Sequence, residues 1–260
     1  SLFKDFINGS LKNPLLTLIF LIFSFLIFSL GALLNRTLCN LGTKVGNVKL
    51  DKISTTPIAI GATFLLALPV PLLIAVIASI ISNSPHISLF SLSISKGLTT
   101  MSAVLFILML FHTMCRPNGL FTDHFQWSVI ARDQLNKTFK WFNWIICLST
   151  FFFVMSITSG KSELRYGLAL LSFIVSGLAI GIFAFQFLKP NDGIAMSILE
   201  NRPKPPFIIF IWPILVIVPV CIVLLPFFGF FDTAIELQSR VFQSGIILFL
   251  IIIAYGIFLR

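Results

Sequence analysis

The chain has 260 residues, of which 57% are hydrophobic, only 10% are charged and 30 are Phe. An ordinary soluble domain carries about 25% charged residues, so this chain has too few to cover a water-exposed surface. Its composition, with a mean hydropathy of +1.03, excludes a water-soluble enzyme, a nucleic-acid-binding domain and a disordered region. The formal net charge is +9, and in a membrane protein such an excess is interpreted by its position along the chain.

Seven apolar stretches are long enough to cross a bilayer. A spanning helix needs about 17–25 mostly apolar residues, because each residue rises about 1.5 Å through a core about 30 Å thick. None of the stretches contains Asp, Glu, Lys or Arg, and none alternates in polarity like a β-barrel strand. We therefore expect an all-α membrane bundle of about seven transmembrane helices, a single domain over residues 1–260. The stretches are 14–34, 57–82, 98–114, 141–158, 166–188, 207–228 and 241–259, and a start nearer residue 87 is an alternative for the short third one.

The distribution of Lys and Arg predicts the orientation of this bundle. Cytoplasmic loops retain positive residues, and the connections here are short enough for that rule to apply. With the start outside, the inner segments carry 12 of the 18 positive residues and the outer segments carry 6. The inner ones are Arg36, Lys44, Lys49, Lys52, Arg116, Arg132, Lys137, Lys140, Lys189, Arg202, Lys204 and Arg260; the outer ones are Lys4, Lys12, Lys96, Lys161, Arg165 and Arg240. We expect a periplasmic N-terminus and a cytoplasmic C-terminus.

The residues with reactive side chains do not form a recognisable catalytic or metal site. The cysteines and histidines have no ligand spacing, so we expect no metal and no cofactor. They are Cys39, Cys115, Cys147, Cys221, His86, His112 and His124. We expect Cys147 and Cys221, which lie within spans, to pack as small apolar residues, and the histidines to be interfacial or packed. The two carboxylates nearest to each other are Asp232 and Glu236, one helical turn apart. Because Arg240 lies one turn beyond Glu236, we expect a surface Glu236–Arg240 pair.

Proline and glycine positions indicate the shapes of two spans. Pro69 and Pro71 interrupt the span 57–82, and Pro213, Pro219 and Pro226 interrupt the span 207–228. Proline lacks an N–H and clashes with the preceding turn, so each position is a candidate kink. Such a kink is either a hinge or a static bend, because membrane helices also tolerate proline without moving.

A pair of glycines indicates a helix-packing face. Gly177 and Gly181 form a GxxxG motif in the span 166–188. Small residues allow close helix approach where lipid provides no hydrophobic drive for association. The motif predicts a packing face without identifying its partner.

The segment before the span 141–158 has amphipathic spacing. Its apolar side carries Ala131, Leu135, Phe139 and Phe142, and its polar side carries Asp133, Lys137 and Lys140, with an expected Asp133–Lys137 pair. This pattern predicts an interfacial helix on the inner membrane surface. The candidate lipid-interface residues are Arg116, Trp127, Lys137, Lys140 and Trp141. They either bind anionic lipid or provide ordinary positive-inside and aromatic anchoring.

Three ordered stretches resemble one known family. They are 44–52 (KVGNVKLDK) with 66–73 (LALPVPLL), then 115–120 (CRPNGL) with 124–127 (HFQW), then 229–237 (GFFDTAIEL) with 239–242 (SRVF). Their content, order and spacing resemble the inner-membrane domain of large, KefA-type, potassium-dependent members of the small-conductance mechanosensitive channels. The aromatic run at 230–231 is Phe-Phe where a more tyrosine-rich run is typical of that branch.

The resemblance implies a channel of the bacterial inner membrane that protects against hypoosmotic shock. It implies a periplasmic region before these helices, then a Gly/Ala-rich pore helix and a cytoplasmic vestibule after them, in a homo-oligomer that is a heptamer. The last span is bulky and aliphatic over 246–253, so the pore is expected outside this segment. Because the chain begins with Ser1 rather than Met and ends one residue after its last span, we expect it to be part of a longer protein.

We expect this segment to be a peripheral, tension-sensing and lipid-contacting domain, and two other functions compete with that expectation. A secondary transporter or permease bundle is the main alternative, although it ordinarily keeps ionisable groups or an inverted repeat in the membrane. The predicted spans contain no Asp, Glu, Lys or Arg, and their one histidine, His112, lies close to a helix end. A membrane-embedded enzyme is less favoured, because no ionisable residues converge on one face. We expect membrane lipids and the channel's own pore and vestibule as partners, and no nucleic acid.

Overall fold

The computed structural model describes residues 2–12, 14–42, 55–116, 121, 128–189, 193–194 and 208–258. All elements in these ranges are helical, and none of these residues forms a strand. In chain order they are α1 (Leu2–Lys12), α2 (Pro14–Gly42), α3 (Thr55–Ala67), α4 (Pro69–Ser82), α5 (Leu89–Met114), α6 (Val129–Thr158), α7 (Ser162–Leu164), the π-helix η2 (Arg165–Ala169), α8 (Leu170–Leu188), α10 (Ile208–Leu224), the 3₁₀-helix η3 (Leu225–Phe228) and α11 (Phe231–Phe258).

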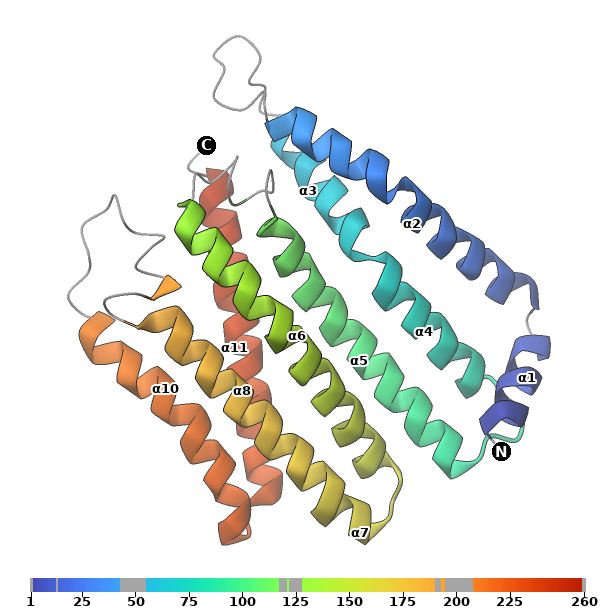
Figure 1. The fold of residues 1–260 in the computed structure, drawn as a ribbon. Helices are drawn as coiled ribbons and strands as arrows, with labels where there is room; N and C mark the ends of the chain where they lie inside the picture. Colours follow the sequence, from blue (N-terminus) through green and yellow to red (C-terminus); the bar gives the residue numbers. More distant parts are fainter. Residues whose placement is uncertain are drawn as a thin grey trace.

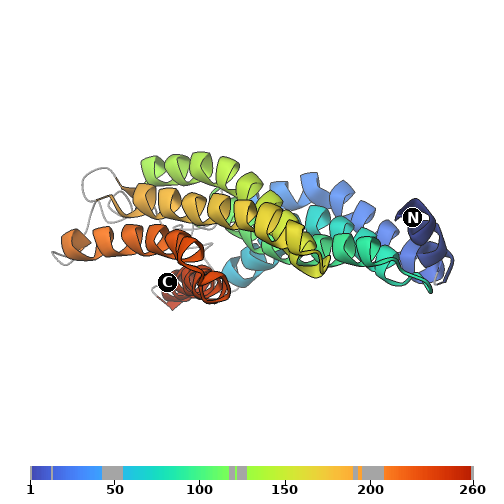
Figure 2. The same cartoon turned by 90° about the horizontal axis from the view of Figure 1, so that it is seen from below.

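The long helices lie side by side in a thin layer. Figure 1 shows α2, the α3–α4 pair, α5, α6, α8 and α10 in succession across the molecule. Turned by 90°, this layer is narrow, and α11 runs along one of its faces (Figure 2). Most spanning helices therefore contact protein on only part of their circumference.

Fewer spans than expected meet the criteria of length and hydropathy. Among the described residues four helices are long and apolar enough to cross a membrane, and the bent α3–α4 pair makes a fifth if it counts as one span. The expected spans 14–34 and 207–228 are represented by the shorter apolar segments Leu18–Gly31 and Pro213–Phe228. The prediction of an all-helical membrane fold is confirmed, whereas the number seven is not.

The prediction of a separate interfacial helix before the fourth span is wrong. Residues 129–140 are the first turns of α6, a single helix of 30 residues. Ser128 begins it, since its hydroxyl accepts from the amide of Ala131 at 3.2 Å. No Pro or Gly follows until the helix ends, so nothing in the sequence interrupts it. At about 1.5 Å per residue α6 is about 45 Å long, and its polar first turns extend beyond the hydrocarbon core.

The apolar stripe of that segment faces protein. Ala131, Leu135, Phe139 and Phe142 are all buried, with Leu135 at 0% exposure. Leu135, Phe139 and Phe142 belong to a core shared by the central helices. In this core Phe249 of α11 contacts the rings of Phe111, Phe139 and Phe187 from α5, α6 and α8. This aromatic cluster attaches α11 to the layer. The apolar periodicity was therefore predicted correctly, but its surroundings were not.

Candidate functional site

The most distinctive local geometry is the bend between α3 and α4. The axes of the segments Pro57–Ala67 and Pro69–Ser82 differ by 47°. Pro69 and Pro71 lack the N–H groups that would bond to the carbonyls one turn earlier, at Leu65 and Ala67. Leu68, between the two helices, instead bonds through its amide to the carbonyl of Leu65 at 3.4 Å. The bend thus lies where the two prolines remove helical hydrogen bonds.

Serines from two neighbouring helices bind the backbone at this bend. Ser24 of α2 donates to the carbonyl of Pro69 at 3.2 Å, and Ser102 of α5 donates to the carbonyl of Pro71 at 2.7 Å. Both serines are buried. A third serine, Ser95 of α5, donates to the carbonyl of Ala78 at 2.8 Å. Hydroxyls in an apolar membrane interior find such partners because an unsatisfied polar group there is costly.

Sequence reasoning missed these serines. Ser91, Ser95 and Ser102 lie four and seven residues apart, which places them on one helical face. That face meets α4 at Ser95 and Ser102 and meets α1 at Ser91, and all three side chains are buried. The spacing was visible in the sequence, but the span was placed at 98–114, and only its alternative start near residue 87 puts all three serines in one helix.

The GxxxG residues lie against α10. At Gly177 a Cβ atom would come within 2.3 Å of Val223 Cγ2 and within 3.1 Å of Gln238 Oε1. At Gly181 the nearest atoms, from Pro219 and Val220, would be 3.8 Å from such a Cβ, an ordinary contact distance. The two glycines therefore differ: α8 approaches its neighbours much more closely at Gly177.

The prolines of α10 do not divide that helix. Pro213 and Pro219 both lie inside the single helix Ile208–Leu224. Pro219 is buried and Pro213 is half-buried. Pro226 lies in η3, which ends at Gly229 with a φ of 85°, in the left-handed region that glycine adopts without strain. The chain thus turns into α11 at Pro226 and Gly229, whereas Pro213 and Pro219 leave the helix unbroken.

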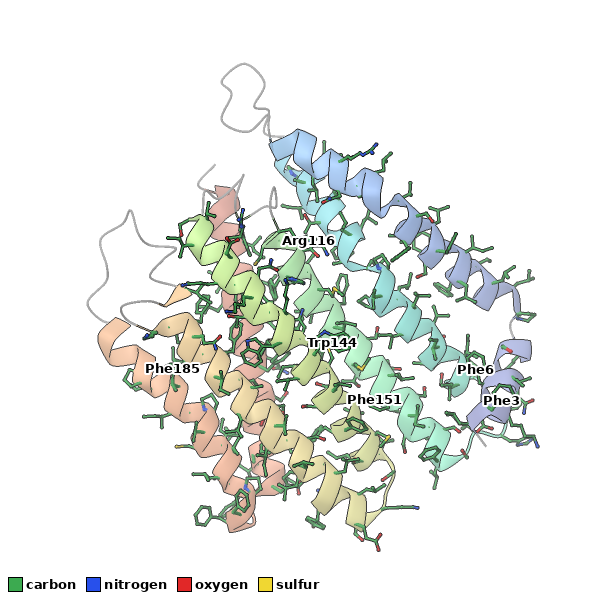
Figure 3. All side chains as sticks on the ribbon, viewed as in Figure 1. Phe3, Phe6, Arg116, Trp144, Phe151 and Phe185 are labelled. Carbon is green, nitrogen blue, oxygen red and sulfur yellow. The ribbon has the colours of Figure 1, made fainter. Side chains whose placement is uncertain are left out.

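The candidate lipid-interface residues differ in exposure. Arg116, Lys137 and Lys140 are exposed, and Arg116 lies at the end of α5 beside the first turns of α6 (Figure 3). Trp141 is half-buried and packs edge-on against Phe142, with ring centroids 5.9 Å apart. Trp127 lies outside the described residues. Trp144 is 72% exposed, so it presents its ring to the surroundings of the layer.

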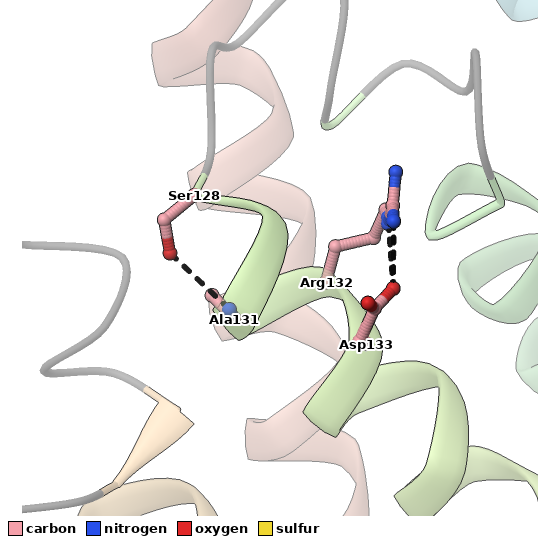
Figure 4. A network of polar contacts seen from close by, with 4 residues as sticks. All are labelled: Ser128, Ala131, Arg132 and Asp133. Atoms are coloured by element: carbon pink, nitrogen blue, oxygen red, sulfur yellow. Dashed lines mark hydrogen bonds and ion pairs between the residues drawn. The ribbon is translucent and has the colours of Figure 1, made fainter.

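The ion pairs at the helix ends agree only in part with the sequence expectations. Asp133 accepts from Arg132, through Nε at 2.9 Å and Nη2 at 2.7 Å, so the predicted Asp133–Lys137 pair is wrong (Figure 4). Asp133 pairs with Arg132 rather than with Lys137, because the planar guanidinium of Arg132 donates twice to one carboxylate oxygen. The predicted Glu236–Arg240 pair is confirmed at 2.9 Å. Both of its side chains are exposed, so it adds little stability.

One polar cluster between α8 and α11 was not anticipated. Gln238 donates from Nε2 to Ser176 Oγ at 2.7 Å, and its buried Oε1 has no hydrogen-bond partner. Both residues line a cavity of about 260 Å³ between α5, α6, α8 and α11.

A second polar contact joins α5 and α6, where His112 Nε2 lies 2.6 Å from Asn136 Oδ1. In the described part of the chain no His, Cys, Asp and Glu residues group as metal ligands would.

These features define a multi-pass helical membrane domain. The chain matches the model of the family "Mechanosensitive ion channel inner membrane domain 1" over residues 14–260, and it therefore belongs to that family. Its members are oligomeric channel proteins of the membrane, not enzymes. No curated protein and no solved structure matches the chain.

Proposed function

We propose that this chain is the peripheral, lipid-contacting and tension-sensing membrane region of a KefA-type mechanosensitive channel. The observation that carries the proposal is the thin layer of helices (Figure 2). In each of the four candidate spans, no more than 33% of an apolar stretch of 18 residues is buried within the chain. Lipid or neighbouring helices must cover the rest.

A layer of this kind couples to bilayer tension through its area. Tension favours the state that occupies the larger area in the membrane plane, and a force shifts an equilibrium only by its differential coupling to the two states. Large apolar side chains are exposed along the whole layer, including Phe25 of α2, Trp144 of α6 and Leu171 of α8. Changes of packing within the layer therefore change the area that lipid surrounds.

The pore belongs to a segment outside this chain. α11, the last helix, exposes bulky side chains at Ile247, Leu248, Leu250 and Ile251 rather than the small residues of a close-packed pore. Only 11% of the apolar 18-residue stretch of α11 is buried, so α11 has room for further helices of the same or another subunit. A homo-oligomeric ring, heptameric by the resemblance, provides such neighbours together with the pore helix and the cytoplasmic vestibule.

The topology that we propose has seven crossings. α2 and α10 run antiparallel to their neighbours in the layer (Figure 1), which supports counting them as spans. With the bent pair as one span, the N-terminus is periplasmic and the C-terminus is cytoplasmic. The channel lies in the inner membrane and protects the cell against hypoosmotic shock. Cysteines placed at Lys4 and Lys161 should react with an impermeant reagent in intact spheroplasts; protection of both would contradict this orientation.

Patch recording under graded suction tests the function. In the full-length channel, deletion of residues 14–82 removes α2 and the bent pair while preserving the orientation of the remaining helices. We expect the tension for half-opening to change and the single-channel conductance to stay the same, because the pore is elsewhere. An unchanged tension would mean that these helices only anchor the channel, and a changed conductance would place them at the pore.

A further inference from the structure

α1 is a docked helix that the family match does not include. The match begins at residue 14, whereas α1 spans Leu2–Lys12. It lies at the corner of the molecule where α4 ends and α5 begins (Figure 1). Its two sides differ, since Asp5 and Gly9 are buried one turn apart whereas Phe3 and Ile7 are exposed on the other side.

The buried side of α1 holds the start of α5 through a carboxylate. Asp5 Oδ2 accepts from Ser91 Oγ at 2.6 Å, from Ser88 Oγ at 3.2 Å and from the amide of Ser88 at 3.4 Å. Ser88 is also the N-cap of α5, because its hydroxyl accepts from the amide of Ser91. A negative charge is favourable at a helix N-terminus, where backbone N–H groups point outward. Asp5 is only 5% exposed.

The same side of α1 touches the backbone of α4. A Cβ atom on Gly9 would lie 1.8 Å from the carbonyl oxygen of Ile80. No side chain fits there without moving one helix, because both contacting groups are backbone. Asp5 and Gly9, one turn apart, therefore fix both the rotation of α1 and its distance from α4 and α5.

The outer side of α1 has the chemistry of a membrane-surface helix. Phe3 is 77% exposed (Figure 3) and Ile7 is 40% exposed, and Lys4 is exposed on the neighbouring part of the helix surface. Lys12 is also exposed, in the last turn of α1. Apolar side chains next to lysines are typical of helices that lie at the boundary of acyl chains and anionic headgroups. The first turns of α2 follow directly and expose Leu15 and Leu18, so the apolar surface continues into the lipid-facing layer.

We propose that α1 binds the bilayer surface through Phe3, Ile7 and Lys4, and that Asp5 and Gly9 clamp it to α4 and α5. The bilayer surface is then connected directly to the first turn of α5. Asp5 acts as a positioning residue, because it holds α1 and does not itself contact lipid. This inference concerns a segment outside the family match and does not depend on the tension-sensing role.

Hydrogen–deuterium exchange of the full-length channel in nanodiscs tests the clamp. We expect Asp5→Ala and Gly9→Val each to accelerate exchange in α1 by about tenfold or more, since local stability sets amide protection. Ser10→Ala is the matched control, because the Ser10 hydroxyl bonds to the carbonyl of Ile7 within α1 itself. Peptides from α8 should exchange as before in all three variants. Unchanged exchange of α1 in both Asp5→Ala and Gly9→Val would overturn the clamp.

Lipid composition tests the partner. In the unaltered channel we compare nanodiscs of phosphatidylcholine with nanodiscs that also contain phosphatidylglycerol. We expect α1 to be better protected with the anionic lipid, and Lys4→Gln to abolish the difference. Phe3→Ser with Ile7→Ser should lower protection in both lipids. Protection that is the same in both lipids and in detergent, with or without Phe3 and Ile7, would contradict a bilayer partner and favour a protein on that face.

Discussion

At the scale of single residues, close packing in this layer depends on small side chains at defined places. Gly177 is in contact with the stiff, β-branched Val223, whereas Gly181, one turn later on the same helix, has room for a methyl group. The same motif thus contains one sterically required glycine and one that tolerates substitution. Motif recognition alone does not separate the two.

We predict that Gly177→Ala destabilises the domain by about 1–3 kcal/mol, the usual cost of forcing extra atoms into a packed contact. Gly181→Ala should be neutral or stabilising by up to about 1 kcal/mol, because Ala favours the helix. Thermal unfolding of the full-length channel in detergent, followed by circular dichroism, compares the two. Equal effects of the two substitutions would contradict the close approach at Gly177.

The hydroxyl of Ser102 should contribute measurably to stability. Ser102→Ala removes a buried hydrogen bond to the carbonyl of Pro71 and should cost about 1 kcal/mol. Ser29→Ala is the control, since the exposed Ser29 bonds to Phe25 within its own helix. The same unfolding assay applies. If Ser29→Ala lowers stability as much as Ser102→Ala does, the hydrogen bond between α5 and α4 stabilises the domain no more than one within a single helix.

At the scale of elements, hydropathy predicted where most helices lie but not how long they are. The span 166–188 falls within η2 and α8, and the span 141–158 falls within α6. α6 and α11 begin about ten residues before the predicted spans, because charged residues end an apolar window without ending a helix. α1 was not expected at all, since eleven residues with Lys and Asp carry no spanning signal.

The surroundings of each helix were less predictable than its existence. A periodic apolar stripe shows that one face is covered, but lipid, a neighbouring helix and the membrane surface all suit the same residues. Leu135 and Phe139 were assigned to a membrane surface and instead pack in a core shared with other helices. Likewise, the proline positions located candidate bends, yet only the α3–α4 pair is divided.

Replacing both prolines should straighten the α3–α4 pair. In a channel carrying Pro69→Ala and Pro71→Ala, restored N–H groups should allow one continuous helix. From the 47° bend and a rise of about 1.5 Å per residue, spin labels at Ile58 and Ser82 should move apart by about 3 Å. Pulsed electron paramagnetic resonance on oligomers diluted with unlabelled chains measures this distance, and Pro213→Ala is the control. An unchanged distance would assign the bend to Ser24 and Ser102 rather than to the prolines.

The docking of α1 should depend on pH only in the acid range. The hydroxyl of Ser91 donates to Asp5 and holds the pKa of that carboxyl below its ordinary value of 3.8. The carboxylate therefore stabilises the docked helix fully above that ordinary value, and this stabilisation is lost as the pH falls through the lowered pKa. Limited proteolysis of α1 should be constant from neutral pH to about pH 5 and rise in stronger acid. Asp5→Asn should remove the acid dependence; its persistence would assign it to another group.

At the scale of the whole molecule, the arrangement favours contact with lipid over a compact core. The helices form one narrow layer with α11 along one face (Figure 2), and most spanning helices expose apolar side chains. A domain of this family built in this way has a large perimeter for its volume. The central claim is that this perimeter changes when the channel opens.

The slope of open probability against tension tests that claim most directly, because it measures the in-plane area difference between the closed and open states. The measurement compares purified full-length channels, with and without residues 14–82, in patches of liposomes of one lipid composition. We predict a shallower slope for the shortened channel, since part of the expanding layer is missing. The same slope and the same midpoint in both channels would contradict a tension-sensing role for this domain.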